Sequence, residues 1–135
     1  MGYGAAMAVP VDRRYSTDHQ WIQRSGEAWR VGLTAFAQDA LGEITMVQLK
    51  IDGVAIAAGD EMGEVEAFKA MTDLYMPVAA ELTKINDDVL ASPTLINEDP
   101  YGAGWLCEVR VLDPDTVDAL LDADAYAALI GATDG

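Results

Sequence analysis

The sequence predicts a small, mainly β protein with short helices and a helical tail near its carboxyl end. Six short runs of β-branched and aromatic residues are typical of strands, and turn signals separate them. The chain has 135 residues, a length that suits one domain. Strands this short and this numerous favour a compact sandwich or barrel.

The strands follow one another through most of the chain. Residues 1–12 hold small residues without a period, so we expect a loose arm before a single domain over residues 13–135. The predicted strands cover residues 19–24, 28–33, 43–49, 61–68, 73–80 and 105–111. Turns between them are expected at Ser25-Gly26, Asp52-Gly53, Gly59-Asp60 and Pro100-Tyr101-Gly102.

One short helix is predicted between the second and third strands. Thr34 is a good N-cap residue for a helix over residues 35–41, because its hydroxyl can accept a bond from the first helical turn. Gly42 stands where a left-handed helix exit favours glycine.

The helical tail covers about residues 114–130. Asp113-Pro114 opens its first helix as a cap followed by a first-turn proline. A second helix spans residues 123–130 and ends at Gly131. The apolar residues of the first helix are Val117, Leu120 and Leu121.

Charge and composition exclude several classes of function. The chain holds 23 acidic and 8 basic side chains, a net charge of −15, and its field repels phosphate backbones and anionic lipids. It has no run of 18 apolar residues that could span a membrane. We therefore expect neither a nucleic-acid nor a membrane partner. One cysteine and no basic leader favour a cytoplasmic location.

Residues that commonly carry catalysis or bind metals are scarce. His19 is the single histidine and no serine or cysteine motif accompanies it, so we expect a structural or orienting role rather than a general base. Cys107 alternates with apolar residues on a predicted strand, which favours a buried, inert thiol. We expect no catalytic residue and no metal site.

Lys69 stands at the predicted tip of a hairpin. Two runs that alternate with period 2 lie on either side of it, separated by about five residues. A lysine at such a tip points to solvent. Taken alone, it reads as an ordinary exposed lysine in a surface ion pair worth about 0–1 kcal/mol.

The wider sequence changes that interpretation, because the hairpin holds Glu66, two residues, Lys69-Ala70, two residues, Asp73 and then Pro77-Val78. This pattern resembles the lipoyl-lysine hairpin of the glycine cleavage system H-protein family. The likeness covers about residues 13–131, with its motifs in order. The other matching strings are Tyr15-Ser-Thr-Asp-His-Gln-Trp21, Val31-Gly-Leu-Thr-Ala-Phe-Ala-Gln38, Leu41-Gly-Glu-Ile44, Val47-Gln-Leu49, Ser92-Pro93, Leu95-Ile-Asn97 and Asp99-Pro-Tyr-Gly-Ala-Gly-Trp-Leu106.

The resemblance implies a fold, a cofactor and a role. The fold is the barrel-sandwich hybrid of lipoyl domains, and the cofactor is lipoate in amide linkage to Lys69. Acylation removes one positive charge, so the net charge changes from −15 to −16. The protein would be a non-catalytic carrier whose arm swings between partner enzymes. Dihydrolipoyl dehydrogenase and a lipoate ligase or lipoyl transferase are among the implied partners.

The resemblance also assigns the residues near the arm. Glu66 and Asp73 would be recognition marks for the ligase and neighbours of the arm. In the family the loaded arm folds back into a cleft lined by a glutamate of the His-Glu-Trp string and by the aspartate after the lysine. Here His19 and Gln20 occupy the string, so the carboxylate is missing, and Asp73 matches the aspartate.

Departures from the family pattern indicate which pathway to expect. Gln20 cannot offer a carboxylate to a cationic aminomethyl nitrogen. Phe68, Met71 and Met76 are expected to make the surroundings of the lysine larger and more apolar. This combination resembles the lipoate-binding proteins of heterodisulfide-reductase-like sulfur oxidation, and we expect that complex as the partner. The alternative is the H protein itself, which serves glycine decarboxylase and aminomethyltransferase.

Three other classes of protein fit less well. A biotin carrier has methionine on both sides of the lysine, where this chain has Phe68 and Ala70. A lipoyl domain of a 2-oxoacid dehydrogenase lacks the Pro-Tyr-Gly-Ala-Gly-Trp string and the helical tail. An interaction module that is never modified at Lys69 stays open at this stage, and an intact mass distinguishes it.

Overall fold

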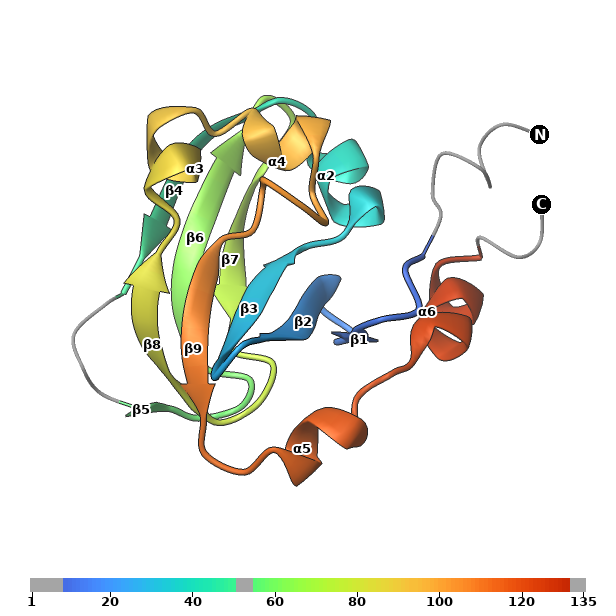
Figure 1. Ribbon diagram of the computed structural model, residues 1–135. Helices are drawn as coiled ribbons and strands as arrows, with labels where there is room; N and C mark the ends of the chain where they lie inside the picture. Colours follow the sequence, from blue (N-terminus) through green and yellow to red (C-terminus); the bar gives the residue numbers. More distant parts are fainter. Residues whose placement is uncertain (1–8, 51–54, 132–135) are drawn as a thin grey trace.

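The computed structural model describes residues 9–50 and 55–131, and two antiparallel sheets enclose its main core (Figure 1). The strand order is β1-β2-β3-β9-β8-β5 in the larger sheet and β4-β6-β7 in the smaller one. The sheets do not close into a barrel, and the prediction of a mainly β fold is confirmed.

The strands are β1 Arg14–Tyr15, β2 Gln20–Ser25, β3 Ala28–Leu33, β4 Ile44–Leu49, β5 Ala55–Ile56, β6 Glu61–Ala67, β7 Met71–Tyr75, β8 Ala80–Ile85 and β9 Cys107–Val111. The helices are α2 Ala35–Leu41, α3 Asp87–Ala91, α4 Leu95–Glu98, α5 Asp115–Asp118 and α6 Ala123–Ile130. All of the strand pairs between described residues are antiparallel, and the neighbouring strands β8 and β9 are joined by residues 86–106, which contain α3 and α4.

Strand β9 joins distant parts of the chain in the larger sheet. It lies between β3 and β8, and its pairs include Val31 with Cys107 and Leu82 with Val109. The β2–β3 hairpin on one side turns at Gly26, which has a φ of +64°. Glycine adopts this left-handed conformation without the steric cost that a side chain would add.

The predicted strand over residues 73–80 is wrong. The chain leaves the smaller sheet after Tyr75 and enters the larger sheet at Ala80, so β7 and β8 belong to different sheets. Pro77 lies between them and has no backbone N–H for a strand ladder. Strand β8 was not predicted from the sequence, and neither were the short elements β1, β5, α3 and α4.

The predicted cap at Thr34 is confirmed, whereas α5 begins one residue later than predicted, with Pro114 at its N-cap position and the Asp113 carboxylate accepting from the Asp115 N–H at 3.1 Å. The Thr34 hydroxyl accepts from the Ala37 N–H at 3.2 Å, and Gly42 ends α2 with a φ of +83°. Helix α6 has the predicted bounds and ends at Gly131 in the left-handed region. Helix α5 is shorter than predicted and ends at Asp118.

Two clusters of buried side chains hold the fold together. The main cluster lies between the sheets and includes Ile22, Val65 and Val109. A second cluster is aromatic, and within it the Tyr15 and Tyr126 rings stack at 4.8 Å between centroids. This cluster fastens α6 to the first strands. Burial of such large rings contributes about 1.5–3 kcal/mol for each side chain.

Two sequence predictions fall wholly or mainly on residues that are not described. The turn at Asp52-Gly53 lies outside the described residues, as do residues 1–8 of the expected arm. Of the arm's remaining residues, Val9 packs against the aromatic cluster and the Pro10 carbonyl accepts from the Tyr15 hydroxyl.

Three of the segments that connect the strands lie together at one end of the sheets. The turn between β6 and β7, helix α2 and helix α4 lie together there, whereas α5 lies near the other end (Figure 1). Segments that are about 30 to 55 residues apart in sequence therefore meet at the hairpin tip.

Candidate functional site

The β6–β7 hairpin places Lys69 at its tip, as the sequence pattern predicts. The turn is closed by a bond from the Ala67 N–H to the Ala70 carbonyl at 2.9 Å, which leaves Phe68 and Lys69 at the apex. Both side chains are exposed. The ion pairs found between described residues do not include Lys69. Its amine is therefore open to an enzyme.

The backbone of the tip is fixed to the loop between α2 and β4. The Lys69 N–H donates to the Leu41 carbonyl and the Phe68 N–H donates to the Glu43 carbonyl, both at 3.0 Å. Gly42 lies between these two acceptors. A Cβ atom there would lie 3.3 Å from Lys69 Cγ, so the lysine stem packs against the glycine backbone. The apex is exposed but its backbone is anchored.

Asn97 of α4 fastens that loop in turn. Its Oδ1 accepts from the Ile44 N–H at 2.9 Å, and its Nδ2 donates to the Gly42 carbonyl at 2.8 Å and to Gln38 Oε1 at 2.9 Å. Asn97 belongs to one of the strings that match the family, but no role was predicted for it. Its bonds cross 53 or more positions of the chain, so no local pattern could reveal them.

A polar hollow of about 490 Å³ lies on one side of the tip. Helices α2 and α4 form its walls together with the Lys69 stem. Three of its lining residues are acidic, and no basic residue other than Lys69 lines it. Its lining residues are Gln38, Asp39, Gly42, Glu43, Lys69, Thr94, Asn97 and Glu98.

A second hollow, of about 280 Å³, is lined by residues from three segments, two of which supply predicted site residues. His19 and Gln20 come from the start of β2, Phe36 from α2, and Asp73 from β7. Most of the α2 wall is apolar. Three of the residues named from the sequence thus share one cleft beside the hairpin.

Glu66 and Phe68 lie outside both hollows. Glu66 pairs in register with Met71 of β7 and with Met46 of β4, so it stands on the outer face of the smaller sheet. Phe68 is 79% exposed and Met71 is 63% exposed. The expectation that apolar residues surround the lysine therefore holds for these two.

For Met76 the same expectation is wrong. Its side chain is fully buried in the main core, and its N–H donates to the Asp60 carbonyl at the opposite end of the hairpin. The residue follows β7 at the end where the chain crosses to the larger sheet, so alternation along one continuous strand misplaced it.

A sequence profile described as "Glycine cleavage H-protein" matches residues 13–133. This chain belongs to the glycine cleavage H-protein family. The glycine cleavage system H protein of Mycobacterium avium (strain 104) is 48% identical over 123 residues, which cover 87% of this chain and 93% of the relative. That of Mycobacterium tuberculosis (strain ATCC 25618 / H37Rv) is 44% identical over 125 residues, with the same coverage.

The fold also matches a solved structure of the glycine cleavage H-protein family. The crystal structure of a glycine cleavage system H protein from Mycobacterium marinum superposes with a TM-score of 0.82 at 38% identity. The match covers 91% of this chain and 99% of that one. The family and the fold inferred from the motifs are therefore confirmed.

Gln20 differs from the glutamate of the glycine cleavage H-protein pattern, and its side chain is fully engaged. It is 1% exposed. Its Oε1 accepts from the Tyr75 N–H at 2.9 Å and its Nε2 donates to the Tyr75 carbonyl. The amide therefore clamps β2 to the end of β7. A carboxylate could accept the first bond but could not donate the second.

His19 forms a wall of the cleft in this member of the glycine cleavage H-protein family. Its Nδ1 lies 2.8 Å from the Tyr126 hydroxyl, which also lies 2.8 Å from Thr34 Oγ1. Its ring packs on Phe36 with 4.9 Å between centroids. Burial lowers the pKa of His19 below its ordinary value, although the charge of Asp18 opposes this. These contacts fit an orienting role better than a base.

Tyr75 and Asp73 meet at the mouth of the cleft. The Tyr75 hydroxyl lies 3.5 Å from Asp73 Oδ2, and the carboxylate charge of Asp73 raises the pKa of the Tyr75 phenol. Cys107 lies far from this chemistry, in the middle of the larger sheet. Burial raises the pKa of its thiol to about 12, as expected for an inert cysteine.

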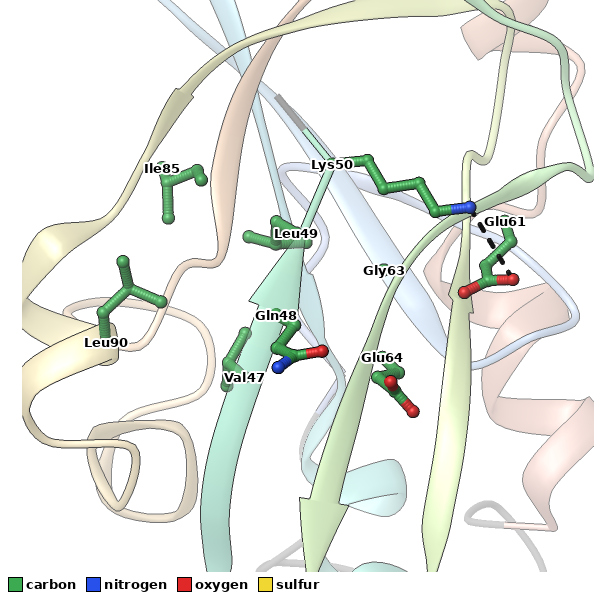
Figure 2. Close-up of a pocket in the computed structure, with 9 residues that line it drawn as sticks. All are labelled: Val47, Gln48, Leu49, Lys50, Glu61, Gly63, Glu64, Ile85 and Leu90. Carbon is green, nitrogen blue, oxygen red and sulfur yellow. Dashed lines mark ion pairs between the residues drawn. The ribbon is translucent and has the colours of Figure 1, made fainter. Parts of the chain in front are cut away.

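A third hollow, of about 450 Å³, lies beside the other end of β4 (Figure 2). Leu90 of α3 and Ile85 of β8 face Leu49 of β4 there. On the other side Lys50 Nζ approaches a carboxylate oxygen of Glu61 at 3.8 Å. This hollow does not contain any of the residues predicted from the sequence to contact the arm.

Residues 9–50 and 55–131 contain neither a cluster of metal-binding side chains nor a membrane-spanning helix. Within these ranges no three histidine, cysteine, aspartate or glutamate side chains come together as a metal site would require. No helix in the same ranges has the length and apolarity needed to cross a membrane.

Proposed function

We propose that residues 13–135 form the lipoyl carrier of a glycine cleavage system, with lipoate in amide linkage to Lys69. Proteins of this family carry covalently attached lipoate. The observation that carries the proposal is an exposed lysine at a turn whose two apical N–H groups are bonded to a neighbouring loop. A long arm on a rigid tip presents one reactive group to several active sites at high effective concentration.

The residues around Lys69 suit this attachment. Its amine is exposed, so a lipoate ligase or lipoyl transferase can reach it without unfolding any element. Glu66 and Asp73 lie on the strands that lead into and out of the turn and serve as recognition marks. When bound, lipoate supplies a dithiolane whose sulfur atoms accept and release the transferred group.

The cleft of about 280 Å³ provides a resting place for the arm. Phe36 and the rest of the α2 wall shield an apolar chain from water, and His19 holds the Phe36 ring in place. Asp18 and Asp73 are the carboxylates that line this cleft and are available to a cationic group, whereas Gln20 is neutral and both of its polar atoms bind the backbone. In this proposal the chain holds the arm, orients its cargo and shields it from water. It does not catalyse the reactions of the partner enzymes.

The names of the relatives favour glycine cleavage over the pathway expected from the sequence departures. The relatives described above are glycine cleavage system H proteins, so we propose glycine decarboxylase, aminomethyltransferase and dihydrolipoyl dehydrogenase as partners. One observation still favours a carrier for heterodisulfide-reductase-like sulfur oxidation. The amide of Gln20 offers the cleft no negative charge, which a neutral sulfur cargo does not need.

Intact mass tests the attachment. The chain is incubated with a lipoate ligase, lipoate and ATP, and we expect a gain of one lipoyl group. Lys69→Arg should gain none, whereas Lys50→Arg and Lys84→Arg should be modified like the native chain. A native chain without the adduct, or an adduct that persists in Lys69→Arg, would contradict the proposal.

Glycine–bicarbonate exchange with a glycine decarboxylase separates the two pathways. We expect the lipoylated native chain to support exchange. The Lys69→Arg variant has no lysine at the attachment site and stays unmodified, so it serves as the control. Lipoylated native protein that supports exchange no better than that control would exclude glycine cleavage and leave sulfur transfer.

A further inference from the structure

Three large apolar side chains are exposed next to Lys69. Phe68 is 79% exposed in the turn, Met71 is 63% exposed on β7 and Met46 is 36% exposed on β4. Glu66 pairs in register with both methionines, so Met46, Glu66 and Met71 form one row on the face of the smaller sheet opposite the buried Val65, and Phe68 lies in the adjoining turn. We call Met46, Glu66, Phe68 and Met71 the hairpin patch.

Acidic side chains border the hairpin patch. In the next row Glu64 pairs with Gln48 and Asp73, and Glu43 accepts the Phe68 N–H at the tip. Residues 42–49 and 61–75 contain five acidic side chains and a single basic one, Lys69. The ion pairs found between described residues leave Glu43, Glu64, Glu66 and Asp73 unpaired. Acylation of Lys69 would remove the one positive charge.

We infer that the hairpin patch is a docking surface for a partner protein with an apolar pocket rimmed by arginine or lysine. This inference rests on the proposed function, because an enzyme that works on the arm must enclose the tip. Exposed apolar side chains supply the contact, and the acidic border steers a basic rim toward it. A second copy of this chain is a poor occupant, since two acidic borders would face each other.

Binding of the unmodified chain to a lipoate ligase tests the inference by calorimetry. A few anchor side chains at the centre of an interface carry most of the binding energy, so we expect a loss of about tenfold in affinity for Phe68→Ser and for Met71→Ser. Leu112→Ser is the matched control. Its side chain is 49% exposed, and it directly follows β9, whose carboxyl end lies at the other end of the sheets from the hairpin tip (Figure 1). This variant should bind like the native chain.

Charge is tested with a second matched pair. Glu64→Lys should weaken binding and reduce its dependence on NaCl between about 50 and 300 mM. Glu27→Lys makes the same change in the β2–β3 turn, at the other end of the sheets, and should leave binding unchanged (Figure 1). Because Phe68, Met71 and Glu64 are on the surface, urea midpoints should stay within experimental error of the native value.

The results of these tests distinguish a failure of the docking surface from a failure of the proposed function. Native affinity in Phe68→Ser and Met71→Ser, with normal lipoylation of the native chain, would overturn the docking surface alone. Self-association of the native chain in sedimentation that Met71→Ser abolishes would show that a second copy covers the patch, and would also overturn it. A native chain that gains no lipoyl group contradicts the proposed function, whatever the affinities.

Discussion

Replacing Asn97 with alanine should loosen the tip that carries Lys69. The substitution removes three hydrogen bonds, from the Ile44 N–H, to the Gly42 carbonyl and to Gln38 Oε1. A hydrogen bond contributes about 0.5–1.5 kcal/mol net, and water can replace part of it at this half-buried position. We therefore expect a loss of about 2–3 kcal/mol in the free energy of unfolding.

Urea unfolding measures that loss. With a slope typical of small domains, the midpoint should fall by about 1–2 M. Hydrogen exchange then shows which backbone N–H groups have lost protection. The N–H groups of Phe68 and Lys69 donate to the loop that Asn97 fastens, so their protection should fall by more than that of the core strands. The rate of lipoylation should fall as well.

Asn86→Ala provides a matched control. The Asn86 side chain also makes three bonds, to the carbonyls of Ala103 and Trp105 and from the Asp88 N–H, but none reaches the tip. It should lower stability by a similar amount and leave the tip protected. Equal loss of protection at Phe68 and Lys69 in the two variants would refute the idea that Asn97 fixes the tip.

Four further substitutions have expected outcomes. Gly42→Ala should cost about 1–3 kcal/mol and slow lipoylation, because its φ of +83° and ψ of −159° suit only glycine and its Cβ would crowd Lys69. Gly59→Ala has a similar φ in open space, so urea midpoints should fall in both but lipoylation only in the first. Gln20→Glu loses its donated bond to β7 and should unfold at lower urea, with a loss of about 1–3 kcal/mol; an unchanged midpoint would contradict the clamp. Burial lowers the pKa of His19, so the fold favours its neutral form and stability should decline as pH falls below about 6.5. Urea midpoints at about pH 5.5 and 7.5 should show a smaller difference in His19→Asn than in the native chain.

Local sequence patterns were sufficient to predict the structural features whose physical cause is local. A cap at Thr34 depends on a side chain and an N–H three residues away, and the exits at Gly42 and Gly131 depend on one backbone conformation. The hairpin tip at Lys69 follows from two alternating runs and a short turn. Each of these was predicted from the sequence, and the order of motifs also identified the family.

The predictions from the sequence were wrong where the structure depends on contacts between segments that are far apart in the chain. Alternation continues smoothly past Tyr75, yet the chain changes sheets there, and this change buries Met76 instead of placing it near the lysine. The six-residue strand β8 was missed because its partner β9 lies about 25 residues further along. Pairing energy of that kind depends on which strand becomes the neighbour.

The amino-acid sequence by itself determined the hairpin, its lysine and the family, because these depend on neighbours in the chain and on ordered motifs. Only the tertiary structure decided what holds the lysine still. From α4, Asn97 bonds the loop that holds the tip, and the Gln20 amide bonds the backbone of Tyr75, each across more than 50 positions. Such bonds form only after the main core has brought the segments together, so no local signal encodes them.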